Sequence, residues 1–135
     1  MILTGNIPPE LSIPVNRQVL GHVERLSAHS DVADALCAAL KPLGDVQLFC
    51  PAPQEYRYVA ASTKGIIFAV AIGMGTIAFR LDSRMVPRAV VSGGEAYPGC
   101  GGDWVSFTLF RDDWPRVDLE FWGRKAYVAA REFKE

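Results

Sequence analysis

The side chains best suited to chemistry in this sequence are a thiol in a glycine-rich segment and two distant histidines. Cys100 lies between Gly99 and Gly101, and flanking glycines let the backbone approach a ligand closely and leave a thiol uncrowded. A nucleophilic cysteine also needs a base, and His22 and His29 are the only histidines in the chain. Cys100 and His22 are therefore the candidate catalytic residues.

Each of these residues also has a purely structural interpretation, which we favour. His22 shares a helical stripe with Val19 and Leu26, where a histidine usually lies at the rim of the core with one hydrogen bond. A metal shared by His22 and His29 is disfavoured, because the rise between them is about 10 Å along a helix axis. No other metal-ligand spacing and no intact phosphate-binding loop occurs, so we expect no metal and no cofactor.

The segment 93–103 is the best candidate for a functional site in the sequence because it contains five glycines. Irregular loops of this length are uncommon in compact domains and tend to be either functional or disordered. A glycine-rich loop of this kind can act as a lid over a pocket. The candidate binding residues of the loop and its base are Tyr97, Gly101, Gly102, Asp103 and Trp104.

Two arginines ahead of this loop are candidates for charge recognition. Arg84 and Arg88 are four residues apart, so any helix there would place both on one side. An anion site is one interpretation. A solvated surface with acidic partners such as Asp82 and Glu95 is the favoured alternative, because isolated surface arginines are weakly informative.

A second glycine motif, at Gly73 to Ala78, has the spacing G-x-G-x-x-A of a dinucleotide-binding loop. That fingerprint requires a helix directly after the glycines. Here residues 76–81 are β-branched, apolar or aromatic in alternation. We therefore expect a hairpin turn rather than a cofactor loop.

The apolar periodicity predicts an α+β fold, with an antiparallel meander of about five strands packed by an N-terminal helix pair and a C-terminal helix. The expected order is α-α-β-β-β-β-α-β-α. Residues 1–13 are expected to form an extended lead. The predicted helices cover 14–28, the stretch from Ser30 or Asp31 to about 41, a weak turn within 82–92, and 114–133; the strands lie near 46–50, 56–61, 66–72, 76–81 and 104–110. Residues 114–122 also fit a strand, but the alanine-rich stretch after them favours a helix.

Composition limits the class of protein. The 135 residues, half of them apolar, predict a single globular domain over 1–135. A net charge of −1 without basic clusters argues against nucleic acid, and no apolar stretch is long enough for a membrane helix. Three cysteines without close pairs, together with an N-terminus that lacks signal-peptide character, predict reduced thiols in the cytoplasm. Cys37 and Cys50 are expected in the core, and Cys100 is expected to be the reactive thiol.

Two classes of function remain open from the sequence. The first, which we favour, is a non-catalytic binding or regulatory module that recognises a protein or small ligand through the 93–103 loop. The second is a small enzyme that uses Cys100 or His22 in a pocket beneath that loop. The favoured class follows from the lack of a complete set of nucleophile, base and orienting group.

Overall fold

The computed structural model describes residues 2–110 and 117–133 of the chain. Over these residues the protein is an α+β structure with a seven-stranded mixed sheet and four α-helices. The helices are α1 (Arg17–Val23), α2 (Ser30–Leu40), α3 (Val86–Val91) and α4 (Leu119–Arg131). The strands are β1 (Ile2–Leu3), β2 (Gln47–Phe49), β3 (Val59–Thr63), β4 (Ile66–Ile72), β5 (Thr76–Arg80), β6 (Glu95–Ala96) and β7 (Trp104–Thr108).

The sheet has the strand order β1-β2-β3-β4-β5-β7-β6. Five of its strands, β2, β3, β4, β5 and β7, pair antiparallel in chain order, so the predicted meander is matched in outline within a larger sheet. Sequence periodicity missed the two edge strands, because two residues are too few to show alternation. The edge strand β1 pairs parallel to β2, which makes the sheet mixed rather than purely antiparallel.

The N-terminal lead is part of the fold, and the expected extended segment over 1–13 instead contains a strand and a 3₁₀ turn at Pro9–Leu11. Its first described residues form β1, and Leu11 is fully buried. The predicted helix over 14–28 is also shorter than expected: a 3₁₀ turn at Pro14–Asn16 precedes α1, which ends at Val23. The chain beyond α1 instead makes isolated bridges, Ser27 with Arg57 and Ala28 with Gly73.

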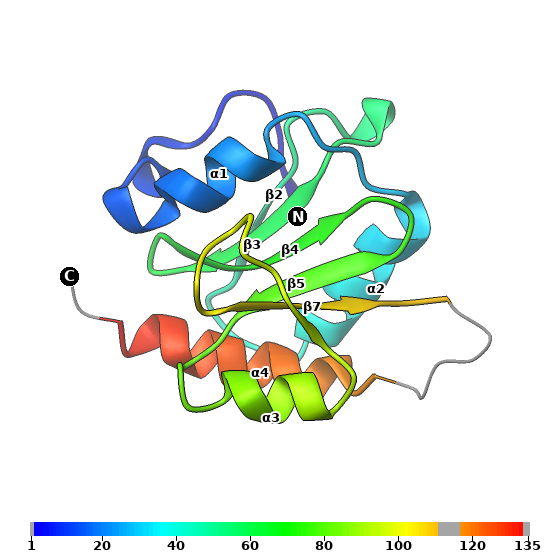
Figure 1. The fold of residues 1–135 in the computed structure, drawn as a ribbon. Coiled ribbons are helices and arrows are strands. Elements are labelled where there is room, and N and C mark those ends of the chain that lie inside the picture. Colours follow the sequence, from blue (N-terminus) through cyan, green and yellow to red (C-terminus); the bar gives the residue numbers. More distant parts are fainter. Residues whose placement is uncertain (1, 111–116, 134–135) are drawn as a thin grey trace.

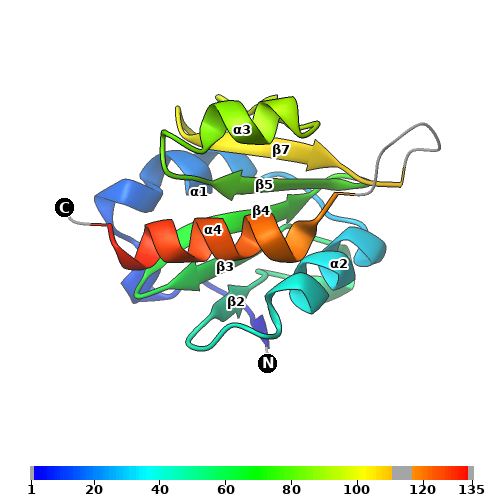
Figure 2. The same ribbon diagram turned by 90° about the horizontal axis from the view of Figure 1, so that it is seen from below.

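Helices cover both faces of the sheet (Figures 1 and 2). α1 lies on one face, and α2, α3 and α4 lie on the other, so the two N-terminal helices do not form the pair that the sequence predicts. Every residue of β4 is buried, as expected for a central strand with both faces covered. A separate apolar cluster fills each side: Val19 and Tyr58 belong to the α1 side, and Leu36 and Phe79 to the α2–α4 side.

The C-terminal helix packs on the sheet as predicted. The side chain of Asp118 caps its start by accepting a hydrogen bond from the backbone N–H of Phe121 at 3.1 Å, a frequent role for aspartate. Trp122 is buried and stacks on Phe107 of β7 with ring centroids 5.8 Å apart. Of the predicted helix over 114–133, residues 114–116 lie outside the described residues, and residues 117 and 118 precede the helix, which begins at Leu119. No helix in the described part of the chain is long and apolar enough to cross a bilayer.

Candidate functional site

The glycine-rich segment 93–103 is packed against α1. The side-chain amide nitrogen of Gln18 donates a hydrogen bond to the carbonyl of Pro98 at 3.2 Å. One turn further along α1, the Nε2 atom of His22 lies 2.9 Å from the hydroxyl oxygen of Tyr97. Gly99 must be a glycine here, because a Cβ atom at this position would come within 2.8 Å of three His22 ring atoms. The loop is therefore in contact with the helix through these side chains.

Cys100 is buried beneath this contact, which corrects the expectation of an accessible thiol. Its exposed fraction is 3%, and burial raises the pKa of the Cys100 thiol to about 12. The described residues give this thiol no hydrogen-bond partner, and His22 bonds to Tyr97 instead. The sequence showed uncrowded glycines around Cys100 but could not show that α1 closes over them. At neutral pH Cys100 is a protonated core side chain, and His22 has the rim position that its apolar stripe predicts.

Most of the candidate binding residues in the loop are engaged in packing. Trp104 is buried at the start of β7, and Tyr97 is half-buried against α1. Gly101 has a positive φ of 144° and lies against the Trp104 ring. Only Gly102 and Asp103 of this group are exposed, so the aromatic side chains that the sequence offered for binding are not freely accessible.

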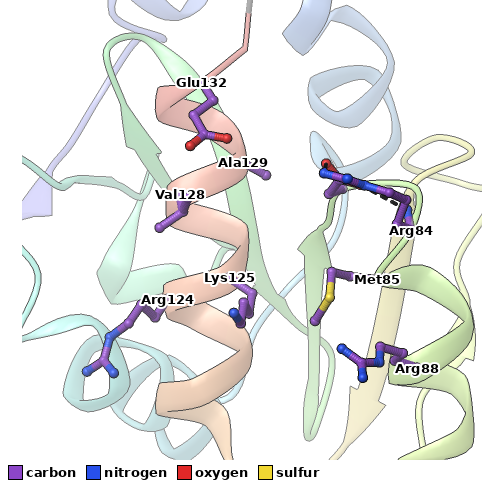
Figure 3. Close-up of a pocket in the computed structure, with 9 residues that line it drawn as sticks. Arg84, Met85, Arg88, Arg124, Lys125, Val128, Ala129 and Glu132 are labelled. Atoms are coloured by element: carbon purple, nitrogen blue, oxygen red, sulfur yellow. Dashed lines mark hydrogen bonds and ion pairs between the residues drawn. The ribbon is translucent and has the colours of Figure 1, made fainter.

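A groove of about 510 Å³ lies between α3 and α4 and is named here the α3–α4 groove. It is lined from the α3 side by Asp82, Arg84, Met85 and Arg88, and from α4 by Arg124, Lys125, Val128, Ala129 and Glu132. In Figure 3 the side chains of Arg84, Met85 and Arg88 extend from the α3 side toward α4. Arg124 and Val128 lie along the opposite flank of α4 in this view.

The charges of the α3–α4 groove are divided between its two ends. At one end Arg84 is held by Asp82, with Nε–Oδ1 and Nη2–Oδ2 distances of 3.1 and 3.2 Å. This hydrogen-bonded pair lowers the pKa of Asp82 and raises that of Arg84, to which the charge of Glu132 also contributes. At the other end lie Arg88 and Lys125 (Figure 3).

The cations at that second end have no acidic partner among the described residues. Neither Arg88, Arg124 nor Lys125 takes part in an ion pair there. The Lys125 ammonium lies 5.5 Å from the ring centroid of Phe121, a contact that leaves its positive charge in place. Between the charged groups, Met85 and Ala129 provide an apolar surface. Val128, on the opposite flank of α4, is 43% exposed.

The structure thus separates the predicted site residues into two groups. Arg84 and Arg88 line the α3–α4 groove, whereas the loop residues from Tyr97 to Trp104 pack with α1 on the opposite face of the sheet. Sequence analysis missed the α4 side of the groove. Lys125 and Ala129 follow each other at a four-residue interval on one helical face, but nothing local in the sequence shows that α3 lies opposite them.

The other sequence candidates have structural roles. His29 precedes α2, and its Nδ1 atom accepts a hydrogen bond from the backbone N–H of Asp31 at 3.1 Å; the cap is therefore His29 rather than Ser30 or Asp31. Gly73 begins the turn between β4 and β5 with a φ of 65°, as the hairpin interpretation predicts. No group of three or more potential metal-binding side chains is found within residues 2–110 and 117–133.

Comparison with protein-family models, with curated proteins and with solved structures gives no match for this chain.

Proposed function

We propose that this chain is a non-catalytic binding module whose α3–α4 groove takes a ligand with a negatively charged group and an apolar part. One observation carries the proposal: Arg88 and Lys125 stand without acidic partners in the described structure beside an apolar surface that includes Met85. A cation in this position attracts an anion, and the neighbouring apolar side chain gains by being covered.

The dimensions of the groove support ligand binding. A volume of about 510 Å³ falls within the roughly 300–1,000 Å³ typical of ligand sites. Such sites combine apolar walls with a few polar groups that fix orientation. Arg88 suits this role, because a guanidinium presents several donors in a plane that matches a carboxylate or phosphate, whereas the guanidinium of Arg84 is already held by Asp82.

The state of the candidate catalytic residues supports a binding role over an enzymatic one. A thiol with a pKa of about 12 carries almost no thiolate at neutral pH, and the thiolate is the reactive form. His22 is occupied by Tyr97. The glycine-rich loop, in this proposal, stabilises the α1 face and leaves recognition to the groove.

A fluorescent apolar anion tests this function. Anilinonaphthalene sulfonate carries the two features that the groove would recognise, and N-phenyl-1-naphthylamine is its uncharged counterpart. We expect the sulfonate to bind more tightly than the amine, and its affinity to fall by about tenfold when Arg88→Glu reverses one wall charge. Rising salt should weaken the binding.

Two variants serve as controls for that titration. Arg25→Glu makes the same charge change two residues after the end of α1, the helix on the opposite face of the sheet from the groove, and Gly102→Ala alters an exposed residue of the glycine-rich loop. Both should bind the sulfonate as the unchanged protein does. Equal loss of binding in Arg25→Glu and Arg88→Glu, or loss in Gly102→Ala alone, would place the site elsewhere.

A further inference from the structure

We infer that the occupant of the α3–α4 groove is an acidic amphipathic helix of a partner protein, an inference that rests on the proposed function of the groove. A helix laid between two helices buries an apolar stripe at intervals of three and four residues and keeps its charged residues at the rim. The described residues supply an apolar strip, a set of cations and a length that fit such a partner.

The concave surface continues past the groove and over α3. A second hollow, of about 360 Å³, is lined by Pro87, Arg88, Val91 and Ser92. Arg88 lines both hollows, so they adjoin at this side chain. A compact small molecule fills one hollow, whereas a polypeptide can extend from one into the other.

Exposed apolar side chains border this joined surface. Val91, which lines the second hollow, is 88% exposed, and Val128, which lines the groove, is 43% exposed. Single exposed apolar residues are ordinary, but a group of them around a hollow is typical of a surface that another protein covers.

The charges of the groove indicate the sign of the charge that the partner carries. Arg88 and Lys125 give the groove two cations without acidic partners among the described residues, and Arg124 adds a cation on the opposite flank of α4 (Figure 3). The opposite end, where Asp82 already holds Arg84, leaves Glu132 as an additional negative charge. Acidic side chains of the partner would therefore contact the Arg88 end, and a neutral or basic stretch would lie near Glu132.

The length of the groove suits about two turns of helix. Its α4 wall runs from Arg124 to Glu132, and this spacing corresponds to about 12 Å at the helical rise. Two turns present three apolar anchors, such as positions i, i+4 and i+7 of the partner. The partner would dock between the side chains of two helices, so it need not add a strand to an edge of the sheet.

Selection from a peptide library tests the inference. The probe is a display library of random 16-residue peptides, selected on the full-length protein. We expect the enriched peptides to combine apolar residues at helical spacing with an excess of Asp and Glu. Their affinity should fall at least about tenfold with Arg88→Glu plus Lys125→Glu, and should remain unchanged with Arg25→Glu.

The outcomes separate this inference from the proposed function. Enrichment of peptides without a helical apolar period, without an acidic excess, or without sensitivity to the groove variant would overturn the inference. If anilinonaphthalene sulfonate still bound in an Arg88-dependent way, the proposed function would stand with a small organic anion as its ligand. If the sulfonate also failed to depend on Arg88, both proposals would be wrong.

Discussion

The Nε2 atom of His22 lies 2.9 Å from the hydroxyl oxygen of Tyr97, although 75 residues separate the two in the chain. Their rings meet edge to face, with centroids 5.3 Å apart. This contact holds the glycine-rich loop on α1 and closes the cover over Cys100, which belongs to the same apolar cluster.

Removal of the Tyr97 hydroxyl should loosen this cover. We expect Tyr97→Phe to lower the free energy of unfolding by about 1 kcal/mol, because one part-buried hydrogen bond is lost. Local opening should also become more frequent, so Cys100 should be alkylated faster in the native protein. Denaturant unfolding measures the first effect, and site-resolved mass spectrometry of iodoacetamide labelling measures the second.

Tyr127→Phe is the matched control for that variant. The Tyr127 hydroxyl donates a hydrogen bond to the carbonyl of Gly44 at 2.6 Å, on the face of the sheet away from α1. This variant should lose a similar amount of stability and leave the labelling of Cys100 unchanged. Equal acceleration in both variants would show that the contact between His22 and Tyr97 has no local role.

The order of thiol labelling should differ from the one that the sequence predicts. Cys50 and Cys100 are buried, whereas Cys37 is half-buried on α2. Burial raises the pKa of all three thiols, so access decides their relative rates. We expect Cys37 to be alkylated first and Cys37→Ser to remove the fastest phase. Labelling of Cys100 ahead of Cys37 would contradict the packing of the loop.

Alkaline pH should destabilise the fold through Cys100. The thiol has a pKa near 9.0 when unperturbed and about 12 when folded. Its contribution to stability is therefore complete below pH 9 and declines as the pH rises toward 12, because the unfolded chain releases the proton first. The decline is about 1.4 kcal/mol per pH unit at most.

A comparison of slopes isolates this contribution from those of the other titrating groups. Cys100→Ala keeps the remaining thiols and tyrosines but cannot release this proton. The free energy of unfolding, measured in urea from pH 8 to 10.5, should fall less steeply in the variant than in the unchanged protein. Parallel curves would mean that Cys100 ionises as easily in the folded state as in the unfolded one.

The meander could be predicted from the sequence because its strands carry their own signals. Residues 66–72 are β-branched or apolar, and glycines mark the turn that follows. The helix over α2 was likewise predicted by apolar residues at four-residue intervals. The spacing of apolar residues is enough to predict an element that has several helical turns or several alternating strand residues.

The candidate site could not be predicted in the same way, because it depends on contacts between distant segments. The burial of Cys100 requires that His22 and Gly99 meet, and the α3–α4 groove requires that Arg88 face α4. Neither pairing has a local sequence signal. Glycines around a thiol indicate backbone freedom, and that freedom serves here to admit a histidine ring rather than a ligand.

The packing of the N-terminal lead likewise depends on contacts between distant segments and has no local sequence signal. Asn16 is the residue that attaches the lead. The Asn16 amide nitrogen donates hydrogen bonds to the carbonyls of Leu11 at 2.9 Å and Gly65 at 2.7 Å. Its carbonyl oxygen accepts from the backbone N–H of Ile67 at 2.9 Å. The side chain is fully buried, so it joins the lead to the β3–β4 turn by contacts that water cannot replace.

Asn16→Ala should therefore destabilise the protein more than most substitutions of a polar residue do. It leaves two carbonyls and one N–H without their partner in a buried region, and we expect a loss of about 3 kcal/mol in the free energy of unfolding. Asn6→Ala changes an exposed asparagine of the same lead and should stay within about 0.5 kcal/mol of the unchanged protein. Urea denaturation of both variants decides the point: if Asn16→Ala were as stable as Asn6→Ala, the lead would not be anchored through this amide.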